Sequence, residues 1–225
     1  MCRYKKIDLE NWCRKEHYLY YTNSLNVEVN MTANIDASEL LSFCHTNGYK
    51  FYPTLIYCVT KVLNRIDNFK MFKDKNGDLC VWDSLVPNYT IFHEEDHTFS
   101  DCWTEFTDDF DSFYKNITSD MELGKTKRGI KVKLGQPANF YCVSCTPWTA
   151  FTAVSSRMVN GGAAFFPIIT AGKYDDNYQM PVNITIAHAV ADGYHIGLFF
   201  SDLQKEVSLK SLKSHLELNC KTKSH

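Results

Sequence analysis

Apolar residues repeat at helical intervals in several stretches of the chain. One stripe, with spacings of one, three and four, predicts a helix that packs on a core and has Pro53 in its first turn; its members are Leu55, Ile56, Val59, Val62, Leu63 and Ile66. Similar repeats predict helices through residues 106–121 and, opened by Gly193, through residues 196–207. Asp36 and Glu39 have the spacing of a capping box, so a shorter helix is expected to end at Gly48.

Alternating and short apolar runs predict a sheet. Val182, Ile184 and Ile186 alternate with polar or small residues, which is the pattern of a strand with two different faces. Further strands are expected at residues 89–92, 140–145, 151–154 and 165–170. The order of these elements predicts an α/β (α+β) two-layer sandwich in which a mixed β-sheet packs against helices.

One hairpin and the ends of the chain complete the expected organisation. Asn76-Gly77 lies between the apolar runs 69–72 and 79–82 and predicts a β-hairpin with a tight turn. The sequence has no repeat, no low-complexity tract and no linker composition, so a single domain over residues 1–225 is expected. The tail, about residues 210–225, is rich in lysine without clear periodicity and is expected to be partly mobile.

Composition restricts the class of partner and the compartment. The 24 Lys and Arg residues balance 26 Asp and Glu residues, so we expect neither nucleic acid nor a membrane surface as a partner. No run approaches the roughly 18 apolar residues that cross a bilayer, and the first residues lack the apolar core of a signal peptide. We therefore expect a cytoplasmic protein whose nine cysteines are reduced thiols.

The clearest candidate for chemistry is His188, which follows the alternating strand directly. A free imidazole, with an ordinary pKa of about 6.5, can take a proton from an alcohol at neutral pH. Asp192 stands four residues later and could orient the ring or organise the turn. A lone His-Asp pair is more often structural than catalytic, so the choice depends on other segments.

Those segments resemble a known family. His-x-x-x-Asp-Gly by itself occurs in several families that use acyl-coenzyme A, including the dihydrolipoyl and the plant acyltransferases. From about Trp12 to Leu203, however, the order and spacing of further segments are similar to the chloramphenicol acetyltransferases. These segments are Trp12-Cys13-Arg14-Lys15-Glu16-His17-Tyr18, Tyr49-Lys50-Phe51-Tyr52-Pro53, Val81-Trp82-Asp83-Ser84, Phe92-His93-Glu94, Thr98-Phe99-Ser100, Val143-Ser144-Cys145-Thr146-Pro147-Trp148, Lys173-Tyr174 and Asp192-Gly193-Tyr194-His195.

The resemblance implies a homotrimer whose active sites lie between subunits, and a direct transfer with no acetyl-enzyme. His188 would be the general base that lets the acceptor hydroxyl attack the thioester carbonyl of acetyl-CoA. Ser144 matches the residue that stabilises the tetrahedral intermediate. Asp192 matches a carboxylate that pairs with the arginine represented by Arg14, and this pair would support the site without carrying a proton. No metal is implied.

The resemblance also assigns binding residues for both substrates. On the acceptor side it matches Tyr20, Tyr21, Leu25, Phe99 and Thr170, and the strand expected after Trp148 adds Val154, Ser156 and Met158. On the acetyl-CoA side, cationic and flat side chains would hold the phosphates and the adenine. These are Lys50, Tyr52, Trp148, Lys173 and Tyr174.

The chain departs from the family near its acceptor site. Ala187 and Ala191 replace a histidine and a cysteine that are common in the family, and the segment 131–137 replaces an aromatic Phe-Pro-x-Gly loop. Chloramphenicol is the leading acceptor. Acetylation of another small alcohol, favoured by Ser156 and Met158, and a catalytically silent trimeric binding protein are the alternatives.

Three other motifs are weighed. His93-Glu94-Glu95-Asp96-His97 matches a zinc signature that requires a helix, but its context predicts strands. Cys142 and Cys145 lie three apart in an expected strand, where they would point to opposite faces. His195 could be a second acid or base, but we expect a hydrogen-bonded structural side chain.

Overall fold

A six-stranded mixed sheet is the centre of the protein, which is described here from a computed structural model. The structure describes residues 3–158 and 161–222, with side chains as far as residue 216. The strand order is β2-β9-β8-β7-β5-β6. β7 pairs in parallel with β5 and β8, and the other pairs are antiparallel. The strands are β2 (Glu28–Asp36), β5 (Val86–His93), β6 (Thr98–Trp103), β7 (Phe140–Thr146), β8 (Ile168–Gly172) and β9 (Gln179–Ala187).

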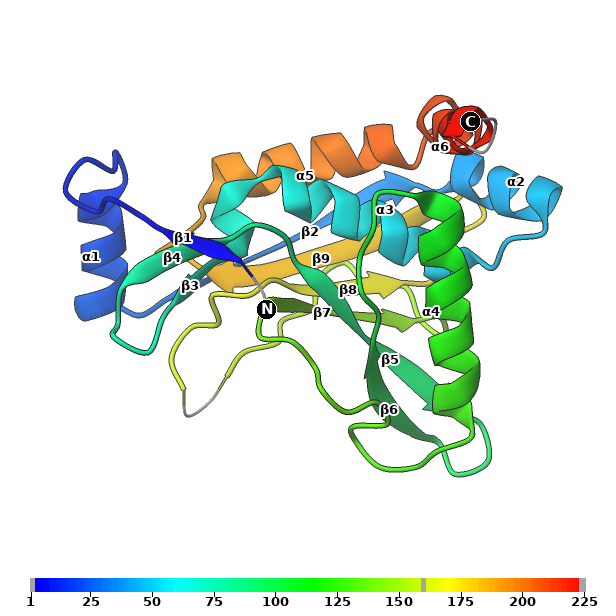
Figure 1. Ribbon diagram of the computed structural model, residues 1–225, viewed down its shortest axis with the longest axis horizontal. Coiled ribbons are helices and arrows are strands. Elements are labelled where there is room, and N and C mark those ends of the chain that lie inside the picture. Colours follow the sequence, from blue (N-terminus) through cyan, green and yellow to red (C-terminus); the bar gives the residue numbers. More distant parts are fainter. Residues whose placement is uncertain (1–2, 159–160, 223–225) are drawn as a thin grey trace.

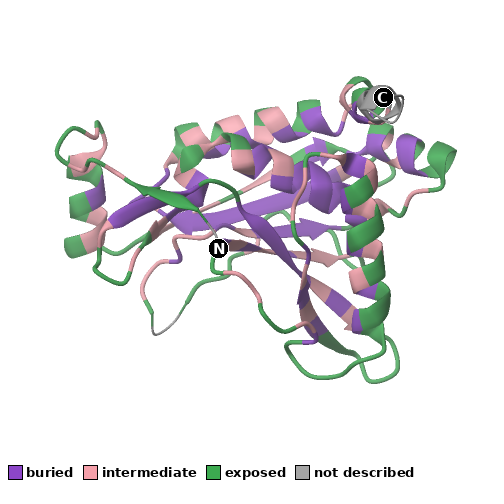
Figure 2. Cartoon of the chain, in the orientation of Figure 1, coloured by how far each residue is buried: buried purple, intermediate pink, exposed green. Residues whose placement is uncertain are grey.

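Helices cover one face of this sheet, and irregular chain lies on the other side (Figure 1). Helices α3 (Phe51–Arg65) and α5 (Gly193–Glu206) run along the covered face, and α4 (Phe110–Lys125) packs beside β5 and β6. Figure 2 shows buried residues running along β9 and α3 between exposed outer loops. The predicted mixed sheet packed against helices is therefore confirmed.

The two faces of β9 differ as the alternation predicts. Val182, Ile184 and Ile186 are buried in the apolar core with α3 and α5. Asn183 points to the opposite face, where its Nδ2 donates to Asn30 Oδ1 at 3.0 Å and to Thr32 Oγ1 at 3.1 Å. Buried polar side chains of this kind are stable when they are hydrogen-bonded, so one face serves packing and the other keeps polar chemistry.

A second, three-stranded sheet has the order β1-β4-β3, from β1 (Tyr4–Lys6), β3 (Met71–Lys73) and β4 (Leu79–Trp82). The predicted hairpin is present, but its turn is not a two-residue turn. Lys73 pairs with Leu79, and Asp74 Oδ1 accepts hydrogen bonds from the backbone N of Asn76 and of Asp78, both at 2.9 Å. The carboxylate of Asp74 thus organises a five-residue loop, and the preceding residues form the 3₁₀ helix η1 (Asp67–Lys70) instead of a strand.

The short helix is α2 (Ser38–Asn47), and its predicted capping box is wrong. Asp36 lies at the end of β2, Ala37 is the N-cap residue, and Glu39 Oε2 instead accepts a hydrogen bond from the backbone N of Leu209 at 2.6 Å. Asp36 Oδ1 still accepts a hydrogen bond from the backbone N of Ser38 at 2.9 Å, so a distant contact replaced only the part of the motif expected from Glu39. Gly48 ends the helix as predicted, with a φ of 71° that favours glycine.

The strand predicted at residues 151–154 is also wrong. This stretch is irregular, and the strand expected at 165–170 begins only at Ile168. Phe151 packs against Gly172, where an added Cβ would lie 2.7 Å from the phenyl ring. The apolar side chain thus serves packing across the sheet without a strand partner.

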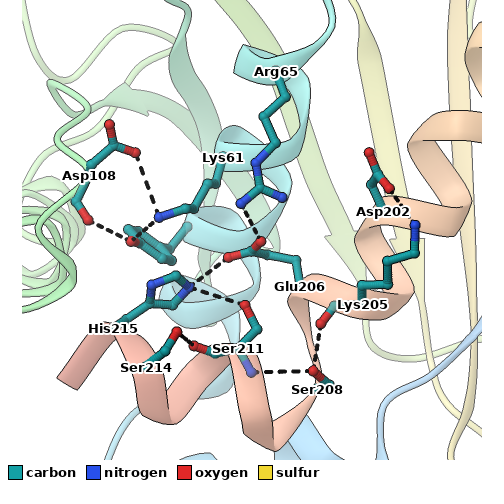
Figure 3. A network of polar contacts seen from close by, with 11 residues as sticks. Lys61, Arg65, Asp108, Asp202, Lys205, Glu206, Ser208, Ser211, Ser214 and His215 are labelled. Atoms are coloured by element: carbon teal, nitrogen blue, oxygen red, sulfur yellow. Dashed lines mark hydrogen bonds and ion pairs between the residues drawn. The ribbon is translucent and has the colours of Figure 1, made fainter. Parts of the chain in front are cut away.

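Four elements were not predicted from the sequence: β1, α1 (Lys15–Asn23), β2 and β6. The tail, about residues 210–225, was expected to be partly mobile; its described part lies in helix α6 (Leu209–Thr222). Figure 3 shows how α6 is attached: His215 Nε2 lies 2.6 Å from Oε1 of Glu206, the last residue of α5. Arg65 Nη2 of α3 lies 2.7 Å from the other oxygen of Glu206. None of the described helices is long and apolar enough to cross a membrane.

Candidate active site

His188 directly follows β9 and is fixed on three sides. Its backbone N donates to Val27 O at 2.8 Å, its ring stacks on the ring of Tyr21 with centroids 4.0 Å apart, and its Nδ1 lies 3.0 Å from Ala191 O. A carbonyl oxygen only accepts, so Nδ1 must carry the ring proton. The neutral ring then has its lone pair on Nε2, which is the form a general base requires.

Asp192 is the N-cap residue of α5 and turns toward Arg14. Its Oδ2 is paired with Arg14 Nη1, while its Oδ1 accepts from the backbone N of Tyr194 at 3.0 Å and lies 2.8 Å from His195 Nδ1. Burial acts to raise the pKa of Asp192, but the hydrogen bonds from His195 and Arg14 outweigh it and lower the pKa to about 2. The carboxylate is therefore ionised at neutral pH and is held on both oxygens.

Ser144 lies on β7, far from His188 of the same chain. It pairs with Thr170 on β8, which pairs with Asn183 on β9, five residues before His188. At about 3.3 Å per residue and about 4.8 Å per strand, the backbones of the two residues lie on the order of 19 Å apart. Within one chain they cannot touch the same carbonyl group.

The candidate acceptor residues fall into two groups. Tyr20 and Tyr21 lie on α1, and Leu25 comes just after its end. Tyr21 stacks on His188, and Tyr20 packs edge-on against Tyr21 with centroids 5.2 Å apart. Phe99 on β6 and Thr170 on β8 belong instead to the Ser144 side of the sheet.

The segment after Trp148 was expected to be a strand that lines the acceptor site, but it is irregular. Val154, Ser156 and Met158 lie in irregular chain, so they do not alternate across a strand. Met158 lines a cavity of about 500 Å³ together with Val27, whose carbonyl holds the backbone of His188. Ser155 and Arg157 line it too, which gives this cavity more polar character than the pattern predicted.

The candidate cofactor residues gather on the Ser144 side. Lys50 and Tyr52 line a cavity of about 220 Å³ with Phe92, and Trp148 packs edge-on against Phe92 with centroids 4.7 Å apart. Lys50 Nζ pairs with Glu122 Oε1 at 2.8 Å. The exposed Lys50 and the exposed ring of Trp148 suit the phosphates and the flat base of a coenzyme A.

Lys173 and Tyr174 follow β8 and extend this surface. The backbone N of Lys173 donates to Thr149 O at 2.9 Å, and the ring of Tyr174 lies 6.4 Å from that of Phe51. The structure therefore brings all five candidate cofactor residues to the part of the chain that holds Ser144. His188, Asp192 and Arg14 form a separate cluster.

The zinc signature at His93–His97 and the cysteine pair at Cys142 and Cys145 form no metal site among the described residues. His93 ends β5 with its Nε2 2.7 Å from Ser100 Oγ, and His97 lies in a turn with a φ of 55°, so no helix joins them. The described residues contain no group of three side chains suited to a metal ion. Cys142 and Cys145 are free thiols on opposite faces of β7.

His195 was expected to be a hydrogen-bonded structural side chain and was not among the predicted site residues. It occupies the third position of α5 and contacts Asp192. Its signal was the three-residue spacing after an N-cap aspartate, the spacing of a capping box, although glutamate and glutamine are the usual residues there.

Comparison with known proteins identifies a family that matches most of the chain. The family model described as chloramphenicol acetyltransferase matches residues 2–204. A chloramphenicol acetyltransferase of Clostridium perfringens is 39% identical over 92% of this chain and 95% of its own length. Chloramphenicol acetyltransferase 3 of Escherichia coli is 35% identical over 90% of this chain and 96% of its own.

Solved structures show the same fold. A chloramphenicol acetyltransferase superposes with a TM-score of 0.76 at 23% identity, covering 92% of this chain and 99% of that one. A dihydrolipoamide acetyltransferase of Azotobacter vinelandii, in which a serine, a histidine and an asparagine were investigated for their role in catalysis, superposes with a TM-score of 0.63 at 14% identity over 89% of this chain and 88% of that one. With relatives this similar over nearly the whole length, the chain belongs to the chloramphenicol acetyltransferase family.

Proposed function

We propose that this protein transfers the acetyl group of acetyl-CoA to a hydroxyl of chloramphenicol and so inactivates the antibiotic, as a single-domain cytoplasmic enzyme. The observation that carries the proposal is the tautomer of His188. Its Nδ1 proton is held by Ala191 O, so its Nε2 is free to accept a proton. Family membership supports the choice of substrates.

His188 acts as the general base in the proposed reaction. Its Nε2 takes the hydroxyl proton while the oxygen bonds to the thioester carbonyl carbon. Ser144 Oγ donates a hydrogen bond to the oxygen of the tetrahedral intermediate, a contribution of about 3 kcal/mol in comparable enzymes. When the C–S bond breaks, the departing thiolate takes the proton back from His188. Coenzyme A and the acetyl ester leave, and no acetyl-enzyme forms.

Two copies of the chain complete each site. His188 and Ser144 lie on the order of 19 Å apart within one chain by strand geometry, yet both must contact one reacting carbonyl. A neighbouring copy that places its Ser144 near His188 meets this requirement, and a closed ring repeats the contact. We propose a homotrimer, as in the family's assembly.

Arg14 and Asp192 support the base without moving protons. Asp192 is ionised and paired with Arg14, so it has no proton to give. Lys50, Tyr52, Trp148, Lys173 and Tyr174 would hold acetyl-CoA on the side of Ser144. Tyr20, Tyr21, Leu25, Val154, Ser156 and Met158 would meet the acceptor from the His188 side, and Phe99 and Thr170 from the other.

A different small alcohol is the second candidate acceptor. The cavity beside Met158 is lined by Asn26, Asn30, Ser155 and Arg157, a polar set that suits a more hydrophilic acceptor. A catalytically silent trimeric binding protein is the alternative of another class.

A thiol-release assay tests the proposal. Purified protein with acetyl-CoA and chloramphenicol should release coenzyme A, and His188→Ala should release almost none. Release by the wild type no faster than by the variant would refute acetylation of this drug. Release with other alcohols only would select the second acceptor, and activity that survives His188→Ala would remove the general-base role.

A further inference from the structure

His195 touches the same carboxylate that Arg14 holds, from the opposite side. It lies one turn into α5 with a side chain only 14% exposed, and its Nδ1 is 2.8 Å from Asp192 Oδ1 and 3.3 Å from the backbone N of Asp192. Its ring packs edge-on against that of Tyr194, with centroids 5.6 Å apart. The imidazole is therefore fixed against the N-terminus of the helix.

The contact distances determine which atom donates. One nitrogen cannot donate to the carboxylate and accept from the backbone N–H at the same time. Asp192 is ionised, and a carboxylate oxygen at 2.8 Å repels a lone pair, so Nδ1 of His195 carries the proton and donates. Arg14 holds Oδ2 and His195 holds Oδ1, which prevents rotation of the carboxylate.

The residue that carries this carboxylate, Asp192, directly follows Ala191, whose carbonyl oxygen orients His188. Ala191 O accepts from Nδ1 of His188, and Ala191 is bonded to Asp192. A carboxylate that rotates would release the backbone N of Tyr194 and loosen the turn between His188 and α5. The orientation of the Ala191 carbonyl, and with it the tautomer of His188, depends on both holders of Asp192.

We propose that His195 is a positioning residue for His188, acting through Asp192 and the Ala191 carbonyl. This inference rests on the proposed function for its kinetic consequence, but its structural content does not need a substrate. It differs from a role as second acid or base, because Nδ1 of His195 is occupied by a carboxylate that stays ionised.

Two substitutions separate the roles. His195→Leu keeps the helix and removes the donor. His195→Gln keeps a side-chain N–H donor but cannot titrate. We expect kcat for acetyl transfer to fall about 10-fold in His195→Leu with KM nearly unchanged, and to return to within about threefold in His195→Gln, since a small misplacement of the base lowers the rate of the chemical step.

Nuclear magnetic resonance of the substrate-free protein gives the independent readout. In the wild type, the ¹⁵N spectrum should show His188 protonated on Nδ1, and the ¹³C titration of Asp192 should give a pKa well below the ordinary value. His195→Leu should mix the two tautomers of His188 and raise the pKa of Asp192, whereas His195→Gln should restore both.

The kinetic and spectroscopic results together decide whether His195 positions His188. An unchanged His188 tautomer with wild-type kcat in His195→Leu would overturn it. Equal loss of kcat in both variants, with a pH profile that loses one limb, would assign His195 a proton-transfer role instead. If the wild type acetylates no chloramphenicol, the proposed function fails, while the two spectra still test the positioning by themselves.

Discussion

The two ends of α5 carry the same three chemical groups in different settings. At the N-terminal end, Asp192 is held by Arg14 and His195. At the C-terminal end, Glu206 is held by Arg65 at 2.7 Å and by His215 at 2.6 Å. Each carboxylate thus has one arginine and one histidine partner.

Their surroundings differ in ways that separate function from architecture. A negative charge is favourable at the N-terminus of a helix and unfavourable at the C-terminus, so Glu206 depends more on its partners than Asp192 does. The side chain of Glu206 is 3% exposed and that of Asp192 31%. The family match ends at residue 204, before Glu206 and α6.

An identical set of chemical groups at the two ends of one helix therefore need not have one role. The cluster at Asp192 lies one residue from the carbonyl that orients His188. The cluster at Glu206 ties α6 and α3 together at the far end of the same helix (Figure 3). Substitutions at the first should change activity, and substitutions at the second should change stability.

The largest expected effect distinguishes two histidines. His188→Ala should lower kcat by about 10²–10⁴-fold, the usual contribution of a general base. His215→Ala, the matched control at the other end of α5, should keep kcat within about twofold at 25 °C because it only anchors α6. Steady-state kinetics of both purified variants checks this. Similar losses in the two would abolish the functional distinction.

Substitutions of the two carboxylates, Asp192 and Glu206, should also differ in their effect on kcat. Asp192→Asn should lower kcat by about 100-fold, since the paired Arg14 loses its charge partner and the turn at His188 shifts. Glu206→Gln should leave kcat nearly unchanged below its unfolding temperature. A kinetic defect in Glu206→Gln that persists at low temperature would show that the far end also controls the site.

For the free energy of unfolding, we expect the substitution at Glu206 to have a larger effect than the one at Asp192. Glu206→Gln should lower the free energy of unfolding by about 1.5–3 kcal/mol, because it weakens charge-assisted hydrogen bonds to Arg65 and His215. Urea unfolding followed by fluorescence measures this loss. Asp192→Asn is the matched variant, and a larger loss there than in Glu206→Gln contradicts the assignment of Glu206 to architecture.

The smallest effect appears in acid. The folded-state pKa of Asp192 is about 2, below its ordinary value of 3.8, so its contribution to stability is complete above about pH 4 and is lost as the pH falls through about 2. The hydrogen bond from His215 and the charge of Arg65 also lower the pKa of Glu206 against the effect of burial. Asp192→Asn should therefore flatten the fall of unfolding free energy between pH 4 and 2. A curve parallel to the wild type would mean that Asp192 is not held as described.

Local patterns predicted what local physics determines. The alternation in β9 placed His188 at a strand end, and the stripe in α3 identified a core helix, because burial imposes these periods. Elements with mixed exposure, such as α1 and β2, have no such period and were missed. The capping box failed because Glu39 binds the N-terminus of α6, which is far away in the sequence.

The site itself could be predicted only in part. The sequence identified His188, Asp192 and Arg14 through the resemblance, but no local pattern shows that Ser144 and His188 lie on strands too far apart to act together in one chain. That separation follows from the order and register of the strands. The role proposed for His195 likewise depends on a contact with Oδ1 of Asp192 that sequence spacing only suggests.

Mixing two inactive variants tests the shared site most directly. Ser144→Ala and His188→Ala chains, each nearly inactive alone, are unfolded together in equal amounts, refolded, and assayed for thiol release with acetyl-CoA and chloramphenicol. Random assembly places an intact His188 beside an intact Ser144 of another chain in about a quarter of the sites. We predict recovery of about that fraction of wild-type activity. Activity no greater than the sum of the separately refolded variants would contradict a site built from two chains.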